Sequence, residues 1–197
     1  ATGDGSSIRQ KEGEAVMPEP IAFESFPKIA RLFRDCIVTE KIDGTNAQIL
    51  VTPDEVKAGS RNRWITPEAD NFGFARWVQA NANVLREVLG EGRHFGEWWG
   101  QGIQRKYGMT ERRFSLFNVS RWFVLGEPAA DKQELIPNCC HLVPVLYKGC
   151  FTTNACETMI AQLALKGSVA APGFMKPAGI VCYHIAGQYM FKKTIEK

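Results

Sequence analysis

Short strand-like runs separated by turn residues occupy most of the chain, and this pattern constrains the fold more than any other feature of the sequence. Alternating and β-branched runs predict strands, and short connections between them favour antiparallel pairing. The run at 45–52 is expected to pair with the run at 36–44 as a hairpin. The run at 56–63 is expected to be an edge strand, and the last two runs, 179–185 and 188–194, are expected to be joined at Ala186–Gly187. About eight strands are predicted, at residues 36–44, 45–52, 56–63, 93–99, 113–119, 141–147, 179–185 and 188–194.

Helical periodicity, with apolar residues three and four positions apart, predicts helices at 18–34, 71–89 and 155–166. Gly90 stands where a C-cap glycine would end the second helix, and the third is expected to begin after a cap at Asn154 and end at Gly167. Together these elements predict an α+β fold, with mostly antiparallel sheets flanked by helices. We expect residues 18–197 to form one compact domain and residues 1–17 to be a flexible N-terminal segment or remnant.

The composition is that of an ordinary globular protein, since 45% of the 197 residues are hydrophobic and 23% are charged. The 24 basic and 21 acidic side chains give a net charge of +3, which permits a nucleic-acid partner without requiring one. No apolar run reaches the roughly 20 residues of a membrane span, and no secretory signal begins the sequence. The six cysteines lack a CxxC spacing, so an intracellular, reducing location is expected, with Cys36 and Cys182 as small core residues.

The segment Glu40–Asn46 places one lysine at the end of a predicted strand, with a carboxylate on each side of it. A lysine has a reference pKa of about 10.4, so roughly 1 in 2,500 is deprotonated at pH 7. Burial, a neighbouring cation or a metal ion would lower that pKa and make the Lys41 amine a nucleophile. Its attack on a nucleoside triphosphate would give a lysyl phosphoramidate. A hairpin turn with exposed charges is the alternative interpretation of this segment.

Further short motifs follow in an order that resembles the covalent nucleotidyltransferases, which comprise ATP-dependent DNA ligases, RNA ligases and mRNA capping enzymes. The order extends over residues 20–195 and is more specific than any single motif. The resemblance implies the nucleotidyltransferase fold, the ATP-grasp-like adenylation domain of ligases. The matching residues are Lys41-Ile42-Asp43-Gly44, Ser60-Arg61, Phe95-Gly96-Glu97, Phe117-Asn118, Ala178-Gly179-Ile180-Val181 and Lys192-Lys193.

Thr45 and Asn46 favour one branch of this superfamily. RNA ligases of the nick-sealing and RNA-editing type resemble E-K-x-x-G-T-N at this motif, whereas DNA ligases usually carry arginine at the position of Asn46. The sequence is therefore most similar to ATP-dependent RNA ligases of the RNA ligase 2 type. Asp43 departs from that branch, which often has histidine there.

The resemblance implies a role for each matching residue. Lys41 would be the nucleophile that takes AMP from ATP, with Mg²⁺ or Mn²⁺ bound by Asp43 and Glu97. Lys192 would neutralise the α-phosphate, with Lys193 as the alternative because adjacent strand residues face opposite sides. The nucleotide-binding residues would be Glu40, Ile42, Asn46, Arg61, Glu97, Phe117, Val181 and Lys192.

Side-chain chemistry is consistent with the more specific of these roles. The Glu40 carboxylate could accept a hydrogen bond from the exocyclic amine of adenine, and the forked guanidinium of Arg61 suits the ribose and a 5′-phosphate. Glu97 would hold the ribose hydroxyls or orient metal-bound water, and Phe117 would stack on adenine. A surface glutamate, a loop arginine and a core phenylalanine are the structural alternatives for Glu40, Arg61 and Phe117.

Two positions depart from the superfamily pattern. Ala178 replaces an acidic residue that helps relatives to bind a divalent metal, and Met190 stands where the last motif would have its first lysine. The chain is therefore an engineered, impaired form, an enzyme with fewer metal contacts, or a protein that no longer catalyses. We expect glutamate at position 178 to raise nucleotidyl transfer strongly, measured as incorporation of labelled AMP.

The sequence thus predicts an ATP-dependent RNA ligase that forms a lysyl-AMP intermediate and joins 5′-phosphate and 3′-hydroxyl ends of RNA. We expect a monomer with no membrane contact. Many relatives carry a further C-terminal domain after the last motif, and the chain is either a truncated form or a minimal ligase. The stretch from Trp98 to Lys106, aromatic and basic, is either a platform for nucleic acid or ordinary sheet packing. A DNA ligase, a capping-type guanylyltransferase and a non-catalytic nucleotide- or RNA-end-binding module remain alternatives.

Overall fold

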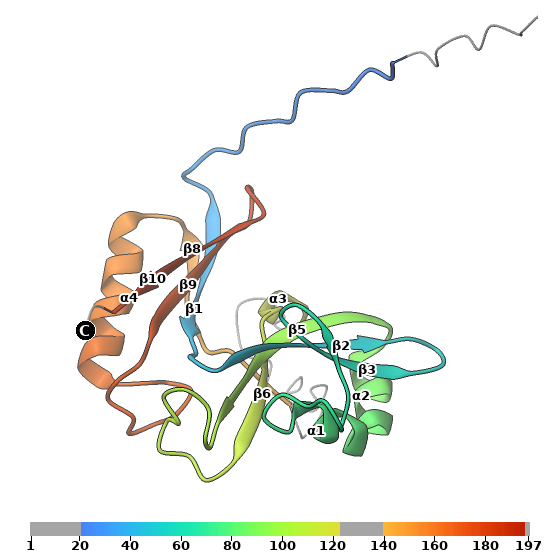
Figure 1. Ribbon diagram of the computed structural model, residues 1–197. Helices are drawn as coiled ribbons and strands as arrows, with labels where there is room; N and C mark the ends of the chain where they lie inside the picture. Colours follow the sequence, from blue (N-terminus) through green and yellow to red (C-terminus); the bar gives the residue numbers. More distant parts are fainter. Residues whose placement is uncertain (1–20, 123–139, 196–197) are drawn as a thin grey trace, which may run out of the picture.

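The computed structural model describes residues 21–122 and 140–195, which form two β-sheets and four helices (Figure 1). The predicted flexible segment 1–17 lies outside the described residues. The helices are α1 (Phe74–Ala80), α2 (Ala82–Leu89), α3 (Val119–Trp122) and α4 (Thr153–Lys166). The strands are β1 (Asp35–Lys41), β2 (Thr45–Val51), β3 (Val56–Ser60), β4 (Trp64–Ile65), β5 (Gly92–Gly100), β6 (Arg112–Leu116), β7 (Cys140–Leu142), β8 (Val145–Cys150), β9 (Gly179–His184) and β10 (Tyr189–Thr194).

One sheet has four strands in the order β10-β9-β1-β8, and the other has six in the order β4-β3-β2-β5-β6-β7. Every pairing is antiparallel except β6 with β7, so the predicted α+β class with mostly antiparallel sheets is confirmed. The predicted strand 141–147 is instead two strands in different sheets, because Pro144 has no N–H to continue a ladder between β7 and β8. The predicted edge strand 56–63 lies inside its sheet, since β4 pairs with β3.

The chain crosses from one sheet to the other between β1 and β2, so the predicted hairpin of these two strands is wrong. β1 pairs with β8 and β9, whereas β2 pairs with β3 and β5. Ile42 is buried at the crossing. A Cβ on Gly44 would lie 2.4 Å from the carbonyl oxygen of Trp98, so only glycine allows the crossing segment to approach β5 this closely.

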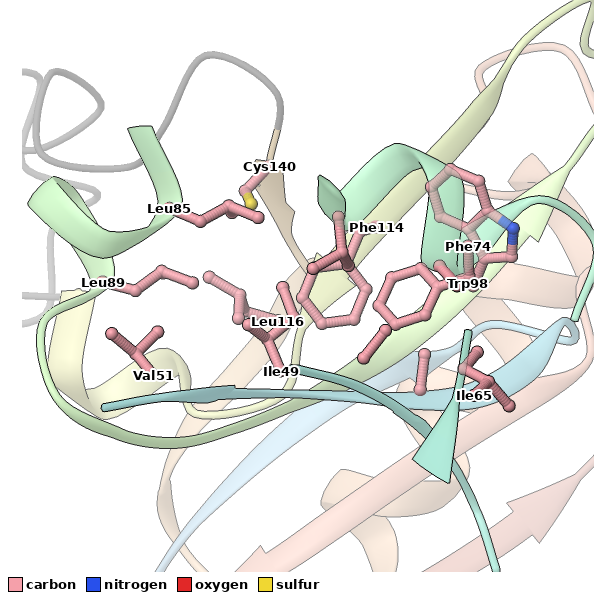
Figure 2. Packing of buried hydrophobic residues seen from close by; sticks show 14 of the residues in the cluster. Ile49, Val51, Ile65, Phe74, Leu85, Leu89, Trp98, Phe114, Leu116 and Cys140 are labelled. Atoms are coloured by element: carbon pink, nitrogen blue, oxygen red, sulfur yellow. The ribbon is translucent and has the colours of Figure 1, made fainter. Parts of the chain in front are cut away.

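Helices α1 and α2 cover one face of the six-stranded sheet. Figure 2 shows Leu85 and Leu89 of α2 against Ile49 and Val51 of β2, with Leu116 beside them. Burying a side chain of this size stabilises the fold by roughly 1.5–3 kcal/mol relative to leaving it exposed. Leu85 and Leu89 are buried as the helical spacing predicts, whereas Val84, which was expected on the same face, is 43% exposed.

The predicted single helix at 71–89 is broken into α1 and α2 at Asn81. Asn81 has φ −108° and ψ 10°, outside the helical region, and its side-chain amide donates to the carbonyl oxygen of Trp77 at 2.8 Å. Asparagine side chains compete in this way with the helical backbone. The glycine end of the helix was predicted correctly, since Gly90 follows α2 with φ 70°.

Helix α4 packs on the four-stranded sheet, where Leu163 contacts the cluster that contains Cys36 and Cys182. Both cysteines are buried, as predicted. The N-cap is Thr152, not Asn154, because the Thr152 hydroxyl accepts from the N–H of Ala155 at 3.0 Å. None of the helices in the described ranges is long and apolar enough to cross a membrane.

The helix predicted for residues 18–34 is absent from its described part, 21–34, which is irregular and exposed. In Figure 1 the segment leads away from both sheets before β1 begins. Pro27 explains the difference, because it removes a backbone donor and disfavours helical geometry at the residue before it. Phe26 and Ile29 are more than four-fifths exposed, so no packing compensates for the missing hydrogen bond.

Candidate functional site

Glu40, near the end of β1, is buried, with 1% of its surface exposed. Its Oε1 accepts from the Ser168 hydroxyl at 2.6 Å, and its Oε2 accepts from the N–H groups of Val169 and Ala170 at 2.8 and 2.9 Å. A buried carboxylate requires such donors, because leaving its charge unpaired is costly. Glu40 therefore anchors the segment after α4 to β1, and any contact with a nucleotide must use its remaining lone pairs.

Glu97 lies on β5 opposite Asn46 of β2 and is 7% exposed. Its Oε1 accepts from the N–H of Gly44 at 2.9 Å, and its Oε2 accepts from the Asn46 amide at 3.1 Å. Burial raises the pKa of Glu97 to about 7, against the Gly44 N–H and the Lys41 charge, which both favour ionisation. Lys41, Asn46 and Glu97 are thus brought together where the sheets meet.

Asp43 is held by Arg105 and Tyr107. Its Oδ2 accepts from the Nε of Arg105 at 2.9 Å, and its backbone N–H donates to the Tyr107 hydroxyl at 2.8 Å. Arg105 also donates from Nη1 to the carbonyl oxygen of Lys176 at 2.9 Å, just before β9. Burial raises the pKa of Tyr107 well above its ordinary value, so its hydroxyl keeps its proton. The crossing segment is thereby fixed to the start of β9.

The two lysines of β10 face opposite sides of the four-stranded sheet. Lys192 is opposite Val181, which is opposite Thr39, so these three side chains share one face. Ile37 lies on the same face and packs in the cluster between the two sheets, so this face looks toward the six-stranded sheet. Lys193 faces the other way and pairs with Glu157 of α4. Lys192 therefore lies on the side of the sheet that also carries Lys41, and Lys193 lies on the side of α4.

Arg61 and Phe117 lie at the ends of strands of the six-stranded sheet. Arg61 follows β3 and is exposed, one residue beyond the pairing of Ser60 with Ala47. Phe117 follows β6, is 38% exposed, and donates its N–H to the carbonyl oxygen of Phe95 at 2.9 Å. This exposure excludes a plain core role for Phe117. Ile42 is buried in the cluster between the sheets, so its side chain packs there.

The residues at this site suit a metal ion whose ligands come mainly from a bound substrate. Among the described residues, no group of three or more His, Cys, Asp or Glu side chains could hold an ion. Ala178 is buried and supplies no ligand, and Asp43 already shares one oxygen with Arg105. Mg²⁺ commonly binds through one or two carboxylates together with water and substrate phosphates. Glu97 and the other oxygen of Asp43 suit that mode.

Sequence reasoning missed Tyr107 and Ser168, and it offered Arg105 only as part of a possible nucleic-acid platform. All three support the site through contacts between residues 62 or more positions apart. Sequence reasoning also offered the wrong surface as a possible platform. Trp98 and Trp99 are buried and donate to the Phe72 carbonyl oxygen and the Ser115 hydroxyl. The alternative, ordinary sheet packing, is the correct one for both tryptophans.

The fold is that of solved RNA ligases. Mutant forms of the Naegleria gruberi RNA ligase match at TM-score 0.56 without ligand and 0.57 with AMP and manganese, each with 21% identity. These matches cover 82% and 83% of this chain but 49% and 50% of the Naegleria chains. A third mutant, with ATP and manganese, matches at TM-score 0.55 and 19% identity, covering 82% of this chain and 50% of its own.

The sequence model of the RNA ligase family matches residues 34–184. This chain belongs to that family. It spans about half the length of the solved ligases that it resembles.

Proposed function

We propose that this chain carries out the nucleotidyl-transfer chemistry of an ATP-dependent RNA ligase, with Lys41 as the nucleophile. One observation carries the proposal. Lys41 ends β1 beside buried Glu97, on the face of the four-stranded sheet that also presents Lys192. Family membership and the ATP and AMP complexes of the Naegleria ligases support the same conclusion.

In the first step the Lys41 Nζ attacks the α-phosphorus of ATP. A P–N bond forms, the bond to the pyrophosphate oxygen breaks, and the amine gives up a proton. Lys192 offsets negative charge on the α-phosphate, and Arg61 binds the ribose and phosphate. Glu97 and Asn46 hold the ribose hydroxyls, while Phe117 and Val181 pack against the adenine. Mg²⁺ or Mn²⁺, when bound with the triphosphate, supplies further charge neutralisation.

In the later steps AMP passes from Lys41 to a 5′-phosphate end, and a 3′-hydroxyl then displaces AMP to join the strands. We propose an RNA substrate and a monomeric enzyme. The thiols of Cys36, Cys150, Cys156 and Cys182 form no disulfide, which supports a reducing, intracellular location.

Strand joining tests the proposal directly. The protein is incubated with ATP, Mg²⁺ and 5′-phosphorylated RNA, and ligated product is measured beside a Lys41→Ala control. Product that requires Lys41 and ATP supports an RNA ligase. Joining of DNA ends in preference to RNA would favour a DNA ligase, and covalent labelling by GTP alone would favour a capping-type enzyme.

Ala178 favours one other candidate, a module that binds nucleotide or RNA ends without catalysis, because its buried methyl group cannot replace a carboxylate. That module would bind ATP equally well with lysine or alanine at position 41 and would form no adduct. Ala178→Glu separates the cases further, since a weakly metal-bound enzyme gains AMP incorporation and a binding module does not.

A further inference from the structure

The six-stranded sheet has one face covered by α1 and α2, and strand register places three rows of side chains on the opposite face, which we call the open face. Asn46 and Glu97 form the first row, within the proposed nucleotide site. The second row, roughly 7 Å further along the strands, contains Trp64, Gln48 and Phe95. The third row contains Lys57, Leu50 and Arg93.

On this open face, contacts join the side chains of Trp64, Gln48 and Arg93. A Cβ on Gly59 would lie 2.7 Å from Gln48 Cγ and 3.1 Å from Trp64 Cε3, so glycine makes room for the indole beside Gln48. The Arg93 guanidinium lies over the indole, 5.3 Å from the ring centroid, and its Nη1 donates to Gln48 Oε1 at 2.8 Å. The Trp64 ring and the Arg93 guanidinium are therefore oriented before any ligand binds.

The two aromatic side chains of the second row, those of Trp64 and Phe95, are accessible. Trp64 is 44% exposed and Phe95 is 51% exposed. Exposed aromatic rings beside arginine suit nucleic-acid bases, because bases stack on aromatic and guanidinium planes and arginine binds phosphate. Within the three rows the only carboxylate is Glu97, which belongs to the proposed nucleotide site, and Glu55 lies beside the third row and pairs with Lys57 at 2.6 Å.

We propose that the Trp64–Arg93–Phe95 surface binds unpaired nucleotides of the RNA strand that enters the reaction. The inference rests on the proposed function, and the surface is continuous with Glu97, two residues from Phe95 on β5. Unpaired nucleotides are specified because a base inside a duplex has both its faces covered by its neighbours. The chain therefore prefers single-stranded or overhanging RNA ends to a fully paired nick.

Binding of a fluorescent, 5′-phosphorylated single-stranded RNA tests this surface in the full chain. Trp64→Ala is expected to weaken binding about tenfold, the loss typical of one stacked base. Arg93→Gln is expected to weaken binding and reduce its salt dependence. Phe191→Ala on β10 and Arg86→Gln on α2 are matched controls, since both lie on other surfaces and should bind RNA like the wild type.

Formation of lysyl-AMP is measured in the same samples and should be unchanged in Trp64→Ala and Arg93→Gln. Unchanged RNA affinity in both variants would overturn the proposed surface. Absence of lysyl-AMP in the wild type would instead overturn the proposed function, whatever the RNA affinity. If a variant misfolds, the affinities of the wild type for two RNA substrates still test the inference. Wild-type protein that binds a fully paired RNA nick as tightly as single-stranded RNA contradicts it.

Discussion

Glu97 is an acidic residue of the proposed site whose pKa is strongly raised by burial. Its pKa of about 7 lies above the ordinary carboxyl value of 4.5, so the folded state binds its proton more tightly than the unfolded state does. The stability that this proton contributes is fully present below pH 4.5 and is lost as the pH rises through 7. Glu97 thus favours the fold in acid and opposes it in mild base.

Glu97→Gln should remove that dependence, since the Asn46 amide can turn to pair with glutamine. Between pH 5 and pH 8 the wild type is expected to lose roughly 2 kcal/mol of unfolding free energy relative to the variant. Urea denaturation at the two pH values measures the difference, with Glu55→Gln on an exposed loop as the control. If the difference in unfolding free energy between wild type and variant is the same at both pH values, the raised pKa of buried Glu97 is contradicted.

Arg105 is a positioning residue, because it touches Asp43 and the Lys176 carbonyl oxygen and not the reacting atoms. Arg105→Ala should slow lysyl-AMP formation about tenfold with little change in the KM for ATP, since small misplacements of a nucleophile are costly. Arg105→Lys should recover only part of the rate, because one ammonium cannot reproduce the fork.

Arg112→Ala is the matched control for Arg105. Its guanidinium also donates to backbone carbonyl oxygens, those of Gln101 and Phe72, but makes no contact with Asp43 among the described interactions. An equal loss of rate in both variants would show that general loosening of the 100–112 loop, and not the hold on Asp43, is responsible.

At the scale of elements, alternation along β10 decides which lysine serves the site. Lys192→Ala is expected to lower the rate of lysyl-AMP formation at least tenfold through lost charge neutralisation. Lys193→Ala should leave that rate near the wild-type value and cost about 0.5 kcal/mol of stability, typical of an exposed pair such as Lys193–Glu157. The reverse order of the two rates would place the site on the α4 side of the sheet.

Local patterns predicted most strands, because β-branched alternation and turn residues act over a few positions. The pairing of β1 with β8 and β9 was not predictable in this way, since partners more than 100 residues away leave no local signal. The order of motifs singled out Lys41, Glu97 and Lys192 as candidate site residues. It could not find Arg105 or Ser168, whose contacts with Asp43 and Glu40 exist only after the sheets meet.

At the scale of the molecule, two sheets with separate cores meet at the short crossing from Lys41 to Gly44. Each sheet contributes residues to the proposed site. Strands β1, β9 and β10 carry Lys41, Val181 and Lys192, β5 carries Glu97, and Phe117 follows β6. The family match and the fold match extend over most of this chain. The proposed nucleotidyl transfer requires in addition that residues of both sheets act on one bound nucleotide.

Intact-mass spectrometry after incubation with ATP and Mg²⁺ is the most direct test of that joint action. We predict a gain of ~329 Da, the mass of one AMP joined to a lysine, and peptide mapping should place it on Lys41. The Lys41→Ala protein should gain nothing. A wild-type mass that stays unchanged, or an AMP group found on a different residue, would contradict the central claim.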